Sequence, residues 1–345
     1  MSDANWRQGS VGAGGAAPLS AASERTPSPG FDVRKREPAP ARVALIGAGA
    51  IGLAVLAELN PKRASATIYR RSPSTTQPEV RYPDGSFMVM ETRQVTDPVD
   101  AEPADWVFIA TKAHQTASTE PWLRRVVGPD TVVVVLQNGI DHATRVPQLV
   151  PSERILPTIV HTVAARHGHI VNVLARNQVL VPPGATFDRL SRLFKAPQLI
   201  EPDPDFAANS WRKLILNTAF NSITTITGAP ASILALPAVS SLFRQTLREG
   251  VRVASAMNVP FRADEAKRLY DVIAALPPKA SSSMRRDWES GAPLETDYLS
   301  GAVIDAGRRT GVPTPTIDAL HGILTALGTY TPQPEPIPQR TRHAS

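Results

Sequence analysis

The fold is decided by residues 43–52, which read Val-Ala-Leu-Ile-Gly-Ala-Gly-Ala-Ile-Gly. The apolar start predicts a buried strand, and the apolar residues from Leu53 to Leu59 have helical spacing. The glycines follow the pattern G-x-G-x-x-G, which permits a tight turn, a close approach of a dinucleotide pyrophosphate and close packing of the helix on the strand. Phosphates bound there would meet free N–H groups at the positive end of the helix dipole. The residues expected to form this loop are Gly47, Ala48, Gly49, Ala50, Ile51 and Gly52.

Two other interpretations of this stretch are weaker. An ordinary glycine-rich turn also contains small residues, but here a strand pattern precedes the glycines and a helix pattern follows them. A membrane span is disfavoured because the apolar run is short and interrupted by glycine. The stretch therefore predicts a dinucleotide-binding strand–turn–helix unit.

Length and composition restrict the class of protein. A chain of 345 residues favours two domains. The absence of cysteine excludes disulfides, a thiolate nucleophile and cysteine-ligated metals, and it fits the cytoplasm. The net charge of +6 can attract an anionic cofactor or substrate, but no dense block of lysine and arginine indicates a nucleic acid. We expect a cytoplasmic protein with a small-molecule substrate, no bound metal, and neither nucleic acid nor membrane as a partner.

The end of the second expected strand, residues 66–69, indicates which dinucleotide is bound. Sites for NAD usually place an acidic residue about 20 residues beyond the glycines, whereas sites for NADP tend to supply arginine for the 2′-phosphate. Arg70 and Arg71 occupy this position here. They favour NADP (NADPH), and the alternative is a solvated arginine pair.

Two further strand ends carry candidate site residues. The apolar runs 105–110 and 131–136 predict central strands, which lead into Thr111-Lys112-Ala113 and Gln137-Asn138-Gly139. Ligands in open α/β sheets lie at the carboxyl ends of the strands. Lys112 and Asn138 are therefore candidates by position, although Asn-Gly is also common in ordinary turns.

The pattern changes along the chain. Residues 1–41 are rich in Ala, Gly, Ser and Pro and are expected to be a disordered extension, or to lie upstream of the true start. Residues 42–203 predict the sheet domain, including one strand over 154–160 and an antiparallel pair over 170–174 and 178–181. Residues 204–330 have helical spacing, and residues 331–345 are expected to be a disordered tail. The predicted fold class is α/β: a Rossmann-type doubly wound sheet followed by an all-helical C-terminal domain.

One predicted helix carries an unusual polar face. Lys213, Asn217 and Asn221 recur every four residues within Trp211-Arg212-Lys213-Leu214-Ile215-Leu216-Asn217-Thr218-Ala219-Phe220-Asn221. Burying a lysine and two asparagines is costly without a ligand or partner. A second polar stretch contains Ser282-Ser283-Met284-Arg285-Arg286-Asp287 and Glu295-Thr296-Asp297-Tyr298.

Together with the glycine loop, Arg70, Thr111-Lys112-Ala113 and Gln137-Asn138-Gly139, these stretches resemble the ketopantoate reductase family over residues 42–330. The resemblance implies NADPH-dependent reduction of a 2-oxo acid, most simply 2-dehydropantoate (ketopantoate) to pantoate in pantothenate and coenzyme A biosynthesis. It implies a C-terminal domain like that of 6-phosphogluconate dehydrogenase, and a monomer or homodimer. It makes Lys213 the general acid and Glu295 the substrate anchor. It places Asn138, Asn217, Asn221 and Ser283 in the substrate pocket, Lys112, Gln115 and Asn138 on the cofactor side, and Arg70 at the 2′-phosphate.

Elementary chemistry agrees with these roles. Hydride addition puts negative charge on the carbonyl oxygen, and a lysine ammonium in reach can neutralise that charge and deliver a proton. Burial lowers the pKa of such a lysine, and a nearby carboxylate opposes that shift. The alternative for Lys213 and Glu295 is a plain salt bridge between elements.

The sequence departs from the family pattern at two places. The family commonly has Asn-Pro where this chain has Asn221-Ser222, and Asn-Gly where it has Ala231-Ser232. Losing a polar side chain beside the substrate alters specificity more than reaction type. The alternatives are therefore a reductase for a different branched 2-oxo acid and, from another class, a non-catalytic NADP-binding sensor.

Overall fold

The computed structural model describes residues 39–175 and 178–329. The predicted N-terminal extension up to Pro38 and the predicted tail 331–345 lie outside the described residues. Among the described helices, none combines the length and apolar character needed to cross a membrane.

A six-stranded parallel sheet organises the first half of the chain. Its strands lie in the order β5-β2-β1-β6-β7-β8. This is the order of the dinucleotide-binding fold, with the strand sequence reversing its direction between β1 and β6. The strands are β5 (Arg93–Val95), β2 (Ala64–Tyr69), β1 (Ala41–Ile46), β6 (Ala104–Ile109), β7 (Val127–Val135) and β8 (Ile155–Pro157).

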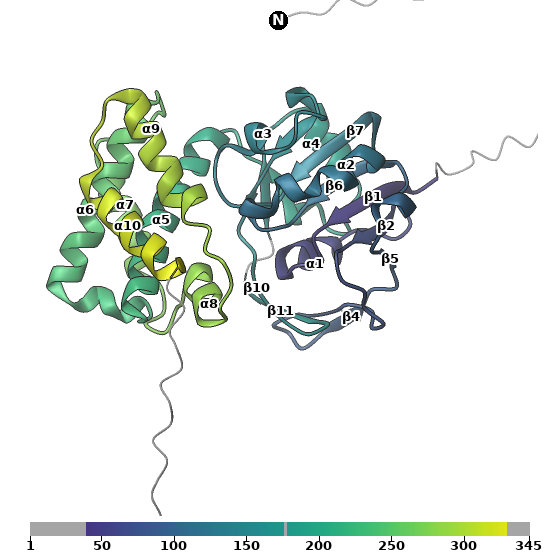
Figure 1. Ribbon diagram of the computed structural model, residues 1–345, viewed down its shortest axis with the longest axis horizontal. Helices are drawn as coiled ribbons and strands as arrows, with labels where there is room; N and C mark the ends of the chain where they lie inside the picture. Colours follow the sequence, from purple (N-terminus) through teal and green to yellow (C-terminus); the bar gives the residue numbers. More distant parts are fainter. Residues whose placement is uncertain (1–38, 176–177, 330–345) are drawn as a thin grey trace, which may run out of the picture. The chain divides into compact units, whose positions relative to one another are not determined.

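Both faces of this sheet are buried, which is why its central strands are continuous apolar runs. Val43 and Leu45 of β1 pack into a core with α1 (Ala50–Leu56) and α4 (Ala185–Ser191). Ala44 and Ile46 point the other way, into a core with α2 (Glu120–Val126). Figure 1 shows α1 and α2 beside the strands of this sheet. The doubly wound α/β fold is confirmed.

Two smaller sheets correct the predicted strand pairing. The expected pair over 170–174 and 178–181 is wrong, because β11 (Ile170–Ala175) pairs with β10 (Val163–His167) and β3 (Glu79–Arg81). β12 (Val179–Val181) pairs instead with β9 (Ile159–Val160) and β13 (Ile200–Pro202). β4 (Phe87–Val89) completes the sheet of β10, β11 and β3.

The strand expected over 154–160 is also two strands. It divides at Thr158, whose hydroxyl donates to the Val135 carbonyl at 2.7 Å. β8 then ends the large sheet and β9 joins the sheet of β12 and β13. One apolar run can therefore contain strands of two different sheets. An apolar pattern indicates burial but not which strand lies alongside.

Every regular element from Phe206 to Thr329 is a helix, which Figure 1 follows in green to yellow. α5 (Phe206–Thr227) ends at Gly228, which has a left-handed φ of +62°. α5 packs closely on α6 at Gly250, where an added Cβ would lie 2.9 Å from Ile215. The other helices are α6 (Pro237–Ala256), α7 (Glu265–Ala274), α8 (Ser283–Glu289), α9 (Ala302–Thr310) and α10 (Pro315–Thr329).

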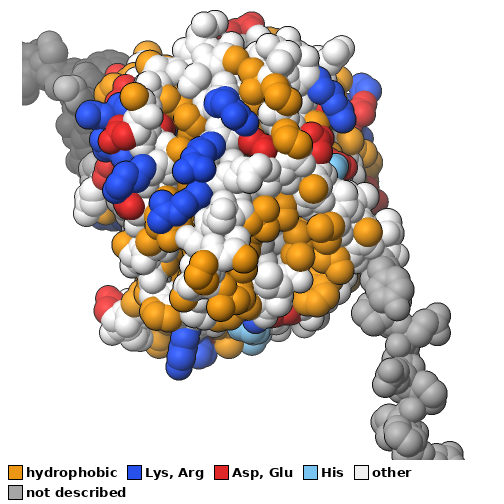
Figure 2. All heavy atoms as spheres, turned by 90° about the vertical axis from the view of Figure 1, so that its left-hand side faces the viewer, with side chains coloured by type: hydrophobic (Ala, Val, Ile, Leu, Met, Phe, Trp, Pro, Cys, Tyr) orange, Lys and Arg blue, Asp and Glu red, His pale blue; other side chains and the backbone are white. Residues whose placement is uncertain are grey.

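The helical half also exposes large apolar side chains, among them Leu236, Leu242, Val272 and Ile323. Figure 2 shows apolar side chains beside lysine and arginine side chains on the face that this half presents. Part of the surface of a folded protein is ordinarily apolar.

Candidate active site

The glycine loop leaves no space for side chains at two positions. Gly47 has a φ of +102°, and an added Cβ would lie 2.7 Å from the Thr111 nitrogen. A Cβ at Gly52 would lie 2.6 Å from that of Ala110, so the third glycine lets α1 pack on the end of β6. At Gly49 the nearest atom, the Ala110 carbonyl oxygen, is 3.6 Å away. Packing therefore explains the first and third glycines, whereas a side chain at the second would fit without a clash.

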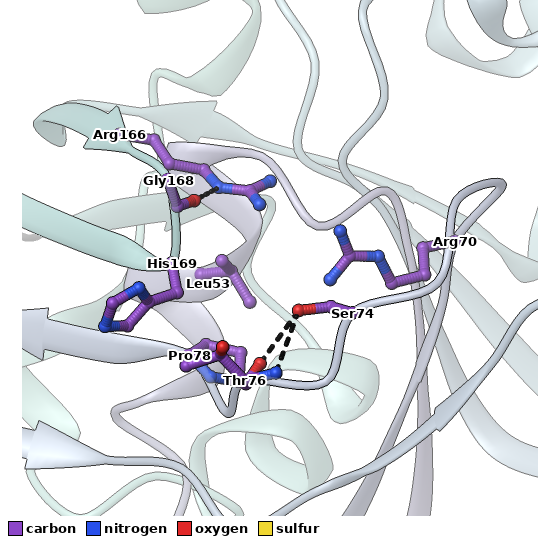
Figure 3. Close-up of a pocket in the computed structure, with 8 residues that line it drawn as sticks. All are labelled: Leu53, Arg70, Ser74, Thr76, Pro78, Arg166, Gly168 and His169. Carbon is purple, nitrogen blue, oxygen red and sulfur yellow. Dashed lines mark hydrogen bonds between the residues drawn. The ribbon is translucent and has the colours of Figure 1, made fainter.

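Arg70 follows β2 and reaches a pocket of about 260 Å³ beside the glycine loop (Figure 3). Its backbone N–H donates to the Val95 carbonyl at 3.0 Å, and its guanidinium donates to the Gln94 side chain at 2.9 Å. Arg71 is exposed. The pocket is lined by Leu53, Arg70, Ser74, Thr76, Pro78, Arg166, Gly168 and His169. No local motif marks Arg166, which lies on a hairpin far from the glycine loop in sequence.

Gln137 joins the two turns that follow β6 and β7. Its side-chain nitrogen donates to the carbonyl and hydroxyl oxygens of Thr111, both at 3.0 Å, and its side-chain oxygen accepts from Thr116 at 2.9 Å. Arg145 donates to the carbonyl of Asn138 at 2.8 Å. These bonds hold the two turns together. Gln137 belongs to the motif Gln137-Asn138-Gly139, but the motif alone does not indicate this positioning role.

Glu295 lies against both turns. Its buried carboxylate accepts from the Ala113 N–H at 2.7 Å and from the Asn138 amide at 3.3 Å. Lys112 lies 4.0 Å from the same carboxylate and donates to Asp287 at 2.5 Å. Burial raises the pKa of Asp287, while the Lys112 charge opposes this rise. Lys112, Asn138 and Glu295 therefore lie together, and Asp287 joins them.

Lys213 projects from α5. Its ammonium donates to the Val160 carbonyl of β9 at 2.7 Å. Burial lowers the pKa of Lys213 to about 8, while the negative charge of Glu295 acts to raise it. Lys213 and Glu295 thus have different hydrogen-bond partners and influence each other through charge, which differs from a plain salt bridge.

The polar face of α5 contains unsatisfied groups. Asn221 is 3% exposed, and its amide nitrogen has no hydrogen-bond partner among the described residues. The hydroxyls of Thr218 and Thr225 are also buried without a hydrogen-bond partner among the described residues. Asn217 is half-buried. Leaving a buried donor unpaired costs about 1–3 kcal/mol, so this face is suited to a polar ligand.

Two other predicted residues lie in different surroundings. Ser283 is exposed at the start of α8, whereas its neighbour Ser282 is buried and caps this helix by accepting from the Arg285 N–H at 3.1 Å. Ser282 also accepts from Thr224 of α5 at 2.8 Å. Gln115 is half-buried in the turn η2 (Ala113–Gln115).

A π-helical turn, η7 (Asp297–Gly301), follows Glu295 closely and continues into α9. The Arg145 guanidinium lies 4.8 Å from the ring centre of Tyr298 in this turn. Single π-helical turns are frequent at functional sites. The sequence pattern predicts an ordinary helix over this segment, so the turn is a structural finding.

Family models match two parts of the chain. Residues 43–184 match the model described as Ketopantoate reductase PanE/ApbA, and residues 205–328 match the model of the C-terminal part of the same family. The chain belongs to the ketopantoate reductase family. It is accordingly an oxidoreductase, with the Rossmann-type sheet and helical C-terminal part expected for that family.

Individual relatives agree with this assignment. The chain is 29% identical over 287 residues to a 2-dehydropantoate 2-reductase from Mycobacterium tuberculosis, covering 82% of this chain and 97% of that protein. It is equally similar to the enzyme of that name from Caulobacter vibrioides, with coverage of 82% and 98%.

Solved structures share the fold. A 2-dehydropantoate 2-reductase from Geobacter metallireducens has a TM-score of 0.76 at 22% identity, covering 83% of this chain and 99% of that chain. A dimeric ketopantoate reductase from Staphylococcus aureus has a TM-score of 0.74 at 23% identity, with coverage of 83% and 98%. A D-mandelate dehydrogenase, solved with NADH and anilino(oxo)acetate, has a TM-score of 0.74 at 20% identity, with coverage of 83% and 98%.

The structure also explains one departure from the pattern of the ketopantoate reductase family. Ser222 donates its hydroxyl to the Thr218 carbonyl at 2.6 Å inside the continuous helix α5. A proline at this position would be unable to donate a backbone N–H to that carbonyl and would clash with it. At the second departure, the N–H groups of Ala231 and Ser232 donate to the carbonyls of Ala280 and Pro278 at 2.8 and 2.9 Å.

Proposed function

We propose that this ketopantoate reductase family member uses NADPH to reduce a 2-oxo acid to a 2-hydroxy acid, with 2-dehydropantoate as the substrate. The observation that supports this proposal most directly is the environment of Lys213. Burial lowers the pKa of this lysine, and the charge of Glu295 opposes that shift. Lys213 lies on the same helix as the unsatisfied amide of Asn221. An acid and a free polar donor on one helix suit a substrate that carries both a ketone and a carboxylate.

The residues of the sheet half fit a dinucleotide. Gly47 allows the tight turn and Gly52 allows α1 to pack on β6, while Ala48, Gly49, Ala50 and Ile51 would present backbone to the pyrophosphate. Arg70 lines a pocket suited to a phosphate, which supports NADPH over NADH. Gln115, Lys112 and Asn138 would lie on the cofactor side of the reaction centre. When bound, NADPH supplies the hydride that the ketone carbon accepts.

The chain's own residues deal with the charge that develops on the ketone oxygen. An ammonium has three N–H donors, and Lys213 uses one on the Val160 carbonyl. Another can donate to the ketone oxygen and transfer its proton as negative charge accumulates there. Glu295 orients the site through Ala113 and Asn138 and favours the protonated form of Lys213. Asn217, Asn221 and Ser283 are the proposed partners of the substrate's polar groups.

The test is a panel of 2-oxo acids assayed with both NADPH and NADH. We expect 2-dehydropantoate with NADPH to have the highest kcat/KM. NADPH binding without turnover of any 2-oxo acid would instead support a non-catalytic sensor.

A second candidate is a reductase for another branched 2-oxo acid. It is favoured by Ala231 and Ser232, which replace the family's usual Asn-Gly and bond through their backbone to residues 278 and 280. A site that lacks a donor for one substrate hydroxyl selects less strongly for that hydroxyl. If 2-dehydropantoate ranks near the bottom of the panel while a bulky 2-oxo acid ranks first, this candidate replaces the first.

We further propose a cytoplasmic enzyme that acts as a monomer or homodimer in pantothenate and coenzyme A biosynthesis. Sedimentation of the full chain measures its oligomeric state. Restoring growth of a pantoate-requiring bacterial strain tests the metabolic role, and failure to restore growth despite expression would contradict it.

A further inference from the structure

The pocket in Figure 3 is built from two parts of the chain that are far apart in sequence. Arg70 and Ser74 come from β2 and the segment after it, whereas Arg166 and His169 come from the β10–β11 hairpin. The guanidinium groups of Arg70 and Arg166 point into the pocket from two sides. Leu53 of α1 adds an apolar surface between them.

The positive charge in this pocket is not balanced. Within the described chain, no aspartate or glutamate lines the pocket, and neither arginine forms an ion pair. Arg70 donates to the neutral side chain of Gln94, and Arg166 donates to the carbonyls of Ala48 and Gly168. Partial burial lowers the pKa of Arg166, and the charge of Arg70 lowers it further. Two guanidinium groups that repel each other are stabilised by an anion placed between them.

Arg166 also connects the hairpin to the glycine loop. One terminal nitrogen donates to the Ala48 carbonyl, and its Nε donates to Gly168 at 2.8 Å. An arginine has five N–H donors, so these two bonds leave others for a ligand. The bond to Ala48 also sets Arg166 beside the loop expected to hold the pyrophosphate.

We propose that Arg166 is a second cofactor-selecting residue, which binds the 2′-phosphate of NADPH opposite Arg70. This inference rests on the proposed use of NADPH. The ligand class is a phosphate monoester on a ribose, held between two guanidinium forks, with the Ser74 hydroxyl on the same pocket wall. The β10–β11 hairpin, outside the glycine fingerprint, then shares in the choice between NADPH and NADH.

The test is equilibrium binding of NADPH and NADH to wild type and to Arg166→Gln, followed by fluorescence or calorimetry. A charge-assisted hydrogen bond contributes about 1.5–3 kcal/mol, so NADPH binding should weaken about 10- to 150-fold, with NADH binding within about twofold of wild type. Arg166→Lys should retain part of the preference, because it keeps the charge but loses the fork. Arg124→Gln, which changes an exposed arginine paired with Glu120, is the matched control and should leave both affinities unchanged.

Adenosine 2′-monophosphate and adenosine 5′-monophosphate separate the phosphate from the rest of the cofactor. Arg166→Gln should weaken the 2′ compound and leave the 5′ compound unchanged. Equal losses of affinity for NADPH and NADH in Arg166→Gln would overturn the inference. They would show that Arg166 acts only through its hydrogen bond to the Ala48 carbonyl.

If the wild type prefers NADPH and Arg166→Gln prefers it to the same extent, this inference is overturned but the proposed use of NADPH is not. A wild type that binds both cofactors equally would overturn the proposed use of NADPH as well. Selective loss of NADPH binding, even if no 2-oxo acid is reduced, would support the role of Arg166 and contradict only the proposed reaction.

Discussion

At one end of the candidate site, Arg70 and Arg166 face a pocket whose described lining holds no carboxylate. At the other end, Lys112 and Lys213 lie under the influence of Asp287 and Glu295. The first region has excess positive charge suited to a fixed anion such as a phosphate. The second has cations and carboxylates together, which suits a group that must gain and lose a proton near neutral pH. Under the proposed function, this difference separates residues that select the cofactor from residues that act on the substrate.

The largest expected effect is at the reaction end. Lys213→Ala should lower kcat by about 10²- to 10⁴-fold, because the proposed general acid is lost, while NADPH binding changes little. Steady-state rates and direct cofactor binding measure the two quantities. Lys267→Ala, at an exposed lysine paired with Asp271, is the control. Near-normal activity of the Lys213 variant would remove this residue from the mechanism.

Charge reversal at the nucleotide end should have the next largest effect. Arg70→Glu should change the ratio of NADPH to NADH affinity by about 10- to 100-fold in favour of NADH, because a charge-assisted bond is lost and repulsion is added. The same change should leave the pH dependence of kcat unaltered. An unchanged cofactor ratio would assign the selectivity to Arg71, Lys112 or Arg166.

The pH profile tests the balance of charge at the reaction end. The lowered pKa of Lys213, about 8, means that its protonated form is lost as pH rises through this value. The kcat/KM of the free enzyme should therefore fall above about pH 8, by about tenfold per pH unit. The negative charge of Glu295 raises the pKa of Lys213, so Glu295→Gln should lower this pKa. The decrease of kcat/KM should then begin at lower pH. A shift to higher pH would contradict the assignment.

A stability measurement compares the glycine loop with an ordinary turn. Gly47 and Gly85 both have positive φ, but an added Cβ meets the Thr111 nitrogen at 2.7 Å at Gly47 and nothing within 4 Å at Gly85. Gly85→Ala should lower the free energy of unfolding by about 1–2 kcal/mol, from backbone strain alone. Gly47→Ala should lower the free energy of unfolding by a further amount of about 1–3 kcal/mol, because the new methyl group also clashes with its neighbours. Urea unfolding measures both, and equal losses would show that the loop adjusts around the new methyl group.

Features that depend on local sequence could be predicted. The glycine spacing and apolar strands 43–46, 105–110 and 131–136 predict the large sheet, because central parallel strands must be apolar on both faces. The helical spacing of apolar residues over 204–330 likewise predicts an all-helical second half, which contains α5, α6, α7 and α10. Strands form within 154–160, 170–174 and 178–181 as predicted, but the first is divided in two and the expected pairing of the other two is wrong, because sheet neighbours depend on distant segments.

The sequence by itself determined the fold class, the dinucleotide loop and the polar face of α5, since these depend on spacing within a few turns of chain. Only the tertiary structure decided that Glu295 binds Ala113 and Asn138, that Lys213 donates to Val160, and that Arg166 reaches Ala48. These contacts join residues more than 50 positions apart. Their existence depends on how whole elements pack, and no local pattern of residues encodes that.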